Sequence, residues 1–150
     1  MRRVLISLFM IALITSMVSY KYSVAKDYES DLEVLINLKD DEVFVEEEFE
    51  VEIRVKNNSE EKKELNFNTG QRFDIIVLGT KEELLYRWSD DKMFTQALGS
   101  LVLEPEEEKA YNAQVILPNE INPGDYKILG MITAEDEIFS QTKTITIKEK

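Results

Sequence analysis

The sequence contains no cysteine and no histidine among its 150 residues. A chain without these residues has no disulfides, no thiolate metal ligands, no cysteine nucleophile and no imidazole general base. The Ser-His-Asp arrangement of many hydrolases is excluded for the same reason. Any catalytic chemistry would therefore have to rest on carboxylates, and the fold must be stabilised by packing alone.

Basic residues are also scarce. The chain has 18 lysines and arginines against 30 aspartates and glutamates, which gives a net charge of −12. This charge repels nucleic-acid phosphates, and no stretch gathers enough lysine and arginine to reverse it. We therefore expect no nucleic-acid partner, and either a soluble monomer or a domain whose partner has a basic surface.

The acidic residues gather in short clusters in hydrophilic, turn-like contexts, where carboxylates are normally just solvated. These clusters are residues 46–48, 90–91, 106–108 and 135–137. None of them shows the D-x-D-x-D spacing that is typical of calcium-binding loops. We therefore expect no enzyme activity, no cofactor and no metal site.

The N-terminal residues have the order of an export signal. Two arginines precede an apolar run over residues 4–18, and small residues lead to a cleavage point after Ala25. The run is short for a membrane-spanning helix, so we favour a cleaved signal peptide over an uncleaved anchor through residues 4–18. Removing residues 1–25 leaves 15 basic and 30 acidic residues, a net charge of −15. We predict an exported domain over residues 26–150, and its lack of cysteine favours a bacterial source.

Beyond residue 31 the hydrophobic period is 2, which is typical of strands. In residues 49–55 apolar side chains alternate with charged ones, so one face is core and the other faces water. Residues 73–78 and 126–132 are more continuously apolar and predict strands covered on both faces, with Gly130 allowing close packing or a bulge. Eight or nine short strands separated by turn signals predict an all-β, antiparallel sandwich of immunoglobulin-like size.

A single helical turn is expected after the strand at residues 84–88. Ser89 precedes two aspartates and resembles a helix N-cap, and Gly99 follows as a helix stop. The sequence therefore predicts a short helix over residues 92–98.

The least generic stretch is residues 66–98, which contains the only Trp and the densest interleaving of aromatic and polar residues. A lone Trp in a sandwich usually fills the space between the sheets. We predict that Trp88 is largely buried, on a face that it shares with Leu84 and Tyr86.

The polar residues of this stretch have structural explanations. The Thr-Gly-Gln sequence at residues 69–71 fits a tight turn in which Gly70 adopts a positive φ. Gln71 and Ser89 are placed to hydrogen-bond neighbouring backbone. Arg87 and Trp88 are expected to point to opposite faces, with Arg87 forming a local salt bridge or anchoring an interface.

Several of these residues, in this order and separation, resemble the BsuPI family, bacterial domains named for an intracellular proteinase inhibitor. The residues that carry the resemblance are Asn57, Asn58, Phe67, Thr69, Gly70, Gln71, Asp74, Tyr86, Arg87, Trp88, Ser89, Phe94, Gln96, Ala97 and Leu98. Further support comes from Tyr111 and from the Pro-Gly-Asp-Tyr sequence at residues 123–126.

The match covers roughly residues 43–133 and departs from the family pattern at two positions. Glu106 stands where a glycine is expected, and Val115 stands where the family tends to have Trp. The resemblance implies an immunoglobulin-like β-sandwich and, by name, protease inhibition.

Two functions remain open at this point. The first is a proteinase inhibitor, which in its substrate-like form needs a rigid, protruding loop at residues 79–83, 89–94 or 118–124. The second is a cell-envelope binding or accessory module without inhibitory activity, which uses a sheet face or an exposed edge strand.

Both functions describe an exported, non-enzymatic domain whose partner is a protein. We predict that the loops at residues 88–94 and 118–124 form the contact region. The candidate partner contacts are Arg87, Asp90, Asp91, Lys92, Asn119 and Glu120.

Overall fold

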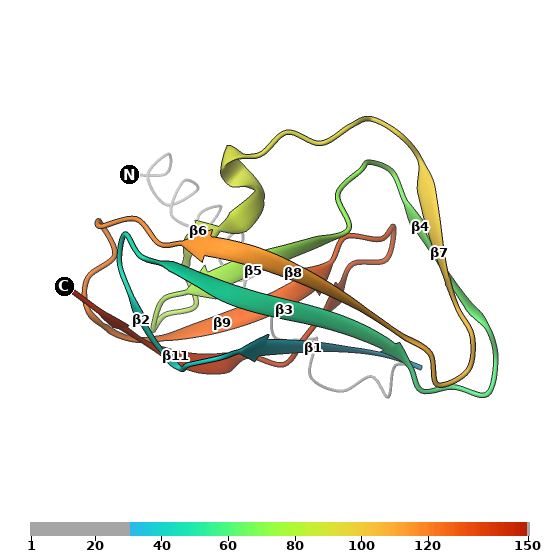
Figure 1. Ribbon diagram of the computed structural model, residues 1–150, viewed down its shortest axis with the longest axis horizontal. Helices are drawn as coiled ribbons and strands as arrows, with labels where there is room; N and C mark the ends of the chain where they lie inside the picture. The colour runs from blue at the N-terminus through green and yellow to red at the C-terminus, as the bar shows by residue number, and fades with distance from the viewer. Residues whose placement is uncertain (1–30, 150) are drawn as a thin grey trace, which may run out of the picture.

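The computed structural model describes residues 31–149. The predicted signal peptide or anchor over residues 1–25 lies outside the described residues. The described chain forms two sheets that face each other, with a two-stranded extension at one end (Figure 1). In this part of the chain no helix is long and apolar enough to cross a membrane.

The first sheet has three antiparallel strands in the order β1-β3-β8. Their bounds are Leu32–Leu38 (β1), Glu48–Asn57 (β3) and Glu108–Ile116 (β8). In β3 the side chains of Val51, Ile53 and Val55 are fully buried, and charged side chains alternate with them on the other face. Burial of each of these side chains contributes roughly 1.5–3 kcal/mol. The predicted alternation is confirmed.

The second sheet has the order β2-β11-β9-β5-β6, with β10 paired to β9. Its strands are Glu42–Phe44 (β2), Phe73–Leu78 (β5), Leu84–Arg87 (β6), Gly124–Ile132 (β9), Ile138–Phe139 (β10) and Lys143–Lys148 (β11). All pairs are antiparallel except β2 with β11. Every residue of β5 after Phe73 is buried, which confirms that this strand is covered on both faces.

The remaining two strands, β4 (Lys63–Phe67) and β7 (Gly99–Leu103), form an antiparallel pair at the end of the sandwich. The described residues thus contain eleven strands rather than eight or nine. Strands as short as β10 have too few residues for a hydrophobic period to show. A 3-10 helix, η2 (Trp88–Asp91), follows β6.

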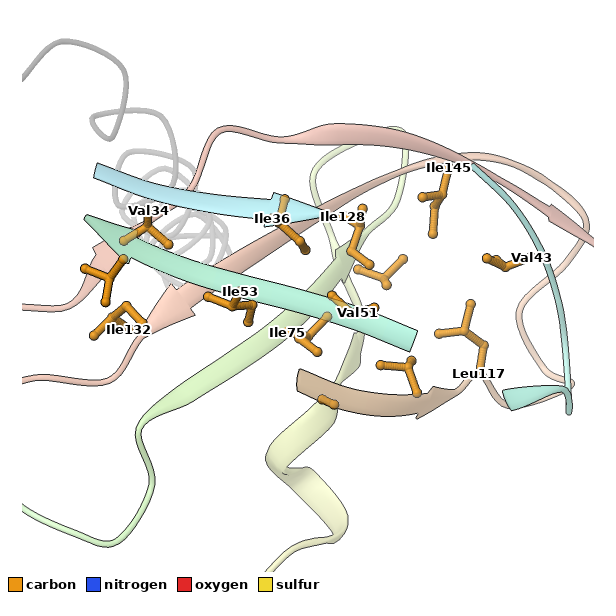
Figure 2. Packing of buried hydrophobic residues seen from close by; sticks show 14 of the residues in the cluster. Val34, Ile36, Val43, Val51, Ile53, Ile75, Leu117, Ile128, Ile132 and Ile145 are labelled. Atoms are coloured by element: carbon orange, nitrogen blue, oxygen red, sulfur yellow. The ribbon is translucent and has the colours of Figure 1, made fainter. Parts of the chain in front are cut away.

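The two sheets enclose one hydrophobic core (Figure 2). Figure 2 shows that both sheets contribute side chains to this core, with Val34 and Ile53 from the first sheet and Ile75, Ile128 and Ile132 from the second. These side chains are at most 4% exposed. The fold is the antiparallel, immunoglobulin-like β-sandwich that the sequence predicts.

Gly130 lets β9 pack closely against β3. A Cβ placed on Gly130 lies 3.0 Å from Cγ1 and 3.2 Å from Cδ1 of Ile53, in the middle of the core. Gly130→Ala should therefore lower the free energy of unfolding by about 1–3 kcal/mol, because Ile53 has to move within a close-packed interior. Urea unfolding measures this change.

The matched control is Gly79→Ala, at the buried glycine that directly follows β5. There an added methyl meets only the carboxylate end of the exposed Glu83 side chain, which can move away. A loss at Gly130 no larger than the loss at Gly79 would contradict the close packing of β9 on β3.

Three glutamates occupy the left-handed backbone region: Glu46 (φ 59°), Glu82 (φ 62°) and Glu106 (φ 63°). Glycine reaches this region without strain, whereas other residues adopt it rarely. Glu106 is the residue that stands where the BsuPI pattern has glycine. The backbone conformation explains that preference, since the turn needs a positive φ whichever residue occupies it.

A buried asparagine ties the turns at the far end of the sandwich together. Asn57 is fully buried, and its Nδ2 donates to the carbonyl oxygens of Glu61, Leu103 and Glu104 at 2.7, 3.0 and 3.2 Å. Its Oδ1 accepts from the backbone N–H and the hydroxyl of Ser59 at 3.0 and 2.7 Å. Asn57 therefore has a structural role, remote from η2.

Candidate functional site

The segment from η2 to β7 runs along the outer edge of the molecule (Figure 1). Its beginning is fixed to β5 by a buried carboxylate. The Asp74 side chain, in a residue only 2% exposed, accepts from the Ser89 hydroxyl at 2.6 Å and from the Ser89 N–H at 3.1 Å. It also accepts from the Ile75 N–H at 3.0 Å. Ser89 thus bonds a carboxylate on β5, and not the neighbouring backbone as the sequence suggested.

The predicted helix over residues 92–98 is wrong. The chain has one 3-10 turn at Trp88–Asp91, and residues 92–98 have no regular structure. Lys92 is extended, with φ −115° and ψ 151°. The physical reason is that the Ser89 side chain, expected as a helix cap, is taken up by Asp74, while the side chains that follow pack on Trp88.

Trp88 is partly buried against the hydrophobic core at the start of η2, and it does not fill the space between the sheets as predicted. Its ring stacks on Phe73 with centroids 4.8 Å apart, and its Nε1–H donates to the carbonyl oxygen of Gln114 at 3.1 Å. Leu84 does not share its environment and is 47% exposed, because the register between β5 and β6 shifts at Val77/Leu78 and breaks the alternation.

The middle of the segment is fixed to the turn at residues 69–71. The Gly70 N–H donates to the carbonyl oxygen of Thr95 at 2.8 Å, and a Cβ on Gly70 would clash with the Thr95 hydroxyl. Gly70 is therefore needed for close approach. The predicted positive φ at Gly70 is wrong, since Gly124 is the glycine with a positive φ in the described chain.

Two further hydrogen bonds close the turn itself. The Gln71 N–H donates to Oγ1 of Thr69 at 3.2 Å, and the Gln71 side chain donates to the carbonyl oxygen of Phe73 at 3.1 Å. These bonds confirm the predicted structural role of Gln71.

Lys92, Met93 and Phe94 alternate in direction, as extended chains do. The Lys92 ammonium lies 4.4 Å from the Trp88 ring centroid, and the Phe94 ring lies 6.3 Å from the same ring. Met93, between them, is 99% exposed. The Met93 side chain therefore points into solvent, because both of its neighbours pack on Trp88.

Next to η2 lies an open depression of about 810 Å³, which we call the acidic depression. It is formed by the β2–β3 turn, β6, η2 and the end of β8 with the loop after it. Its lining residues are Glu46, Leu85, Tyr86, Arg87, Asp90, Asp91, Ile116, Leu117, Pro118, Asn119 and Glu120. Four carboxylates against one guanidinium make it acidic, and Ile116, which is 53% exposed, adds apolar surface.

The structure brings the predicted contact residues together. Arg87, Asp90, Asp91, Asn119 and Glu120 all line the acidic depression. The sixth, Lys92, lies beside it, where its ammonium pairs with Asp91 at 2.6 Å and covers the Trp88 ring. Within residues 31–149 no group of three acidic side chains is placed to hold a metal ion.

Two residues of this region, Glu46 and Met93, could not be recognised as candidate contact residues from the sequence. Glu46 enters from a distant turn whose backbone N–H donates to the carbonyl oxygen of Leu117 at 2.9 Å. Met93 was assigned to the predicted helix. Its exposure could have been inferred only from the period-2 spacing of Lys92 and Phe94 around it.

Tyr86 lies in the acidic depression and has a perturbed hydroxyl. Burial, and then the negative charges of Asp91, Asp74 and Asp90, raise its pKa from the ordinary 10.0 to about 12. A raised pKa means that folding favours the neutral phenol. This contribution to stability is complete below pH 10 and is lost as the pH rises through 12.

Spectrophotometric titration of tyrosinate should detect this shift. The difference between the wild type and Tyr86→Phe should be a single transition with a midpoint near pH 12. The Tyr86→Phe protein should also lose less stability to urea between pH 9 and pH 11.5 than the wild type does. A difference transition near pH 10 would contradict the desolvated environment of Tyr86.

The profile of the family described as "BsuPI: Intracellular proteinase inhibitor" matches residues 36–137, from within β1 to the residue before β10. The chain belongs to the BsuPI family. The matched range includes the acidic depression and the segment from η2 to β7. Among curated proteins, none matches this BsuPI-family chain.

Solved structures show the fold in other settings. Spo0M, a sporulation control protein from Bacillus subtilis, is 16% identical with a TM-score of 0.54, over 79% of this BsuPI-family chain and 50% of Spo0M. The CARDB domain of a Pyrococcus furiosus protein is 20% identical with a TM-score of 0.46, over 80% of this chain and 94% of that domain. A β-glucosidase from Listeria innocua is 14% identical with a TM-score of 0.45, over 81% of this chain and 16% of the enzyme. The chain spans half the length of Spo0M, and this likeness shows the fold alone.

Proposed function

We propose that this chain is an exported, non-enzymatic protein-binding domain that inhibits a protease. It contacts the protease through η2, the segment after it and the acidic depression. The BsuPI family supplies the class of partner, and the surface itself supports the site.

One observation carries this proposal: an exposed segment begins at η2, directly beside the acidic depression at one end of the sandwich. The segment is held by Asp74 at its start and by Gly70 at its middle, so little chain entropy is lost on binding. Preorganised loops of this kind characterise tight complexes between proteases and inhibitors, which bury about 1,600 Å² in total.

The charge of the site favours a partner with a basic rim. Glu46, Asp90, Asp91 and Glu120 line the acidic depression together with Arg87, and the chain as a whole carries a net charge of −12. Attraction between opposite charges speeds the encounter of two proteins, and salt reduces it over a screening length of about 8–10 Å. The association rate should therefore fall as the ionic strength rises.

The test is titration of the full-length chain against a panel of proteases that covers the serine, cysteine, aspartic and metal-dependent classes. We expect saturable inhibition of at least one protease, with a dissociation constant of roughly 10⁻⁷ M or below. Inhibition of none of them, over all classes, would overturn the proposal. Capture of a non-protease partner at the same surface would favour the accessory module instead.

Matched variants separate the site from overall charge. Replacing Asp90, Asp91 and Glu120 by their amides should slow association and flatten its salt dependence. Replacing the exposed Glu60, Glu61 and Glu64 by glutamine makes the same change in net charge at the opposite end of the sandwich, near the β3–β4 turn. Equal effects of the two triple variants would remove the contact assignment.

We further propose that the exported domain comprises residues 26–150 and works outside the cytoplasm. Support comes from the two arginines and the apolar run of residues 4–18. Expression of the whole chain in a bacterium, fractionation and mass spectrometry of the N-terminus test this. A mature chain beginning at Lys26 outside the cytoplasm is expected, and an intact chain in the cytoplasm would overturn it.

A further inference from the structure

We infer that residues 90–96 form a substrate-like reactive loop in which the Met93 side chain enters the specificity pocket of the inhibited protease. This inference rests on the proposed function and adds to it the residue that selects the partner. It follows from the shape of the segment, from what holds it, and from the absence of a comparable residue on the other two candidate loops.

The shape fits the way proteases bind peptides, which is as an extended strand whose alternate side chains enter pockets. Lys92 is extended, and Lys92 and Phe94 both turn back onto Trp88. Met93 therefore presents its whole side chain outward, with 99% of its surface exposed. Apart from Met93, the most exposed large apolar side chain of the described residues is Leu98, at 81%.

The loop is held on both sides of the Met93–Phe94 peptide bond. On one side Asp74 binds Ser89, and the Lys92 N–H donates to the carbonyl oxygen of Ser89 at 3.1 Å. On the other side the Phe94 ring packs near Trp88, and Gly70 binds the carbonyl oxygen of Thr95. Both sides of the bond thus remain in place even if the bond is cut.

This anchoring explains how a substrate-like loop inhibits. Hydrolysis of the Met93–Phe94 bond consumes one water and leaves a carboxylate on Met93 and an amine on Phe94. Because the amine is held beside the carbonyl carbon, it does not diffuse away and can reform the bond. The protease therefore stays occupied, with slow net cleavage.

The other two candidate loops lack these features. Residues 79–83 form a tight turn, closed by a bond from the Glu82 N–H to the carbonyl oxygen of Gly79 at 3.0 Å, with Glu82 at φ 62°. In residues 118–124 the apolar side chain, Ile121, is only 7% exposed. Neither loop presents an extended chain with an outward apolar side chain.

The chemistry of Met93 indicates the kind of specificity pocket that the partner has. A thioether is apolar and unbranched, so it fits a deep hydrophobic specificity pocket and not one with a carboxylate at its base. We therefore expect the partner to be a protease that cleaves after large apolar residues, and serine proteases of known pocket chemistry serve as the test case.

The experiment measures inhibition constants of full-length variants against two serine proteases, one with an apolar specificity pocket and one with an aspartate at the base of the pocket. Met93→Gly should weaken inhibition of the first by about 100-fold or more, as loss of a central anchor does. Met93→Leu should stay within about tenfold of wild type. Met93→Arg should lose the first protease and gain the second.

Leu35→Ala is the matched control, since it removes an exposed apolar side chain on β1, outside the proposed contact surface, and should leave inhibition unchanged. Mass spectrometry after prolonged incubation should find a chain heavier by one water, with Phe94 as a new N-terminus. Wild-type inhibition that Met93→Gly and Met93→Arg leave unaltered would overturn the reactive loop while the proposed function stands. Inhibition of no protease at all would overturn both.

Discussion

Replacing Asn57 by aspartate should lower the free energy of unfolding by about 3 kcal/mol or more. The change turns a donor into a carboxylate that faces the carbonyl oxygens of Glu61, Leu103 and Glu104 within 3.2 Å, in a residue with no exposed surface. Three acceptors lose their donor, and the buried negative charge keeps only the N–H and the hydroxyl of Ser59 as partners while it faces three carbonyl oxygens. Few single substitutions in this domain should cost more.

Asn58→Asp provides the matched control, one residue further on. Asn58 is exposed, and its side chain donates to the Glu33 carboxylate at 3.0 Å. Its replacement should cost no more than about 0.5–1 kcal/mol. Urea unfolding at pH 7 measures both variants, and similar losses at the two positions would contradict the buried hydrogen-bond hub at Asn57.

Replacing Asp74 by alanine should cost about 2–4 kcal/mol and should also weaken inhibition. The Ser89 hydroxyl, the Ser89 N–H and the Ile75 N–H all lose their acceptor, and an unsatisfied buried group costs about 1–3 kcal/mol. The start of the segment after η2 would then no longer be fixed to β5. Affinity should fall because the segment has to be ordered on binding.

A double-mutant cycle with Ser89→Ala isolates this bond. Because both single variants break the same hydroxyl–carboxylate contact, the double variant should cost clearly less than the two single losses combined. Asp136→Ala, at an exposed aspartate in another turn, should change stability by less than about 0.5 kcal/mol. Additive losses at Asp74 and Ser89 would contradict the anchoring role of Asp74.

The sandwich could be predicted from the sequence because its signal is local. In β3 the alternation of Val51, Ile53 and Val55 with charged residues specifies both the strand and its buried face. The continuous apolar run in β5 indicates a strand covered on both faces. A resemblance to the BsuPI family could likewise be seen in the residues around Gly70 and Trp88, and the matched profile over residues 36–137 confirms it.

The conformation after Trp88 could not be predicted because tertiary contacts decide it. Ser89 before two aspartates is a good helix start by local rules. In the fold, however, the Ser89 hydroxyl bonds Asp74, 15 residues earlier in the chain. Lys92 and Phe94 find the Trp88 ring, which favours an extended chain over a helical one.

The predicted contact residues lie close together in the fold. Their proximity depends on strand pairing between distant parts of the chain, which the local sequence does not reveal. Asn119 and Glu120 lie beside η2 because β8 pairs with β3 and delivers its end next to Trp88, whose indole bonds Gln114. The loop choice stayed open in the sequence because residues 79–83, 89–94 and 118–124 are all polar turns. The structure separates them by the tight turn at residues 79–83, the exposed Met93 and the buried Ile121.

The most direct test of the proposed contact surface is a hydrogen-exchange footprint of the full-length chain in complex with a protease it inhibits, inactivated by replacing the catalytic serine with alanine. The inactive protease keeps its specificity pocket but cannot cut the loop. Amides of residues 90–96 and 118–124 should become protected, while those of the β3–β4 turn at residues 58–62 should not. Protection confined to a sheet edge, with residues 90–96 exchanging as in the free chain, would contradict the account.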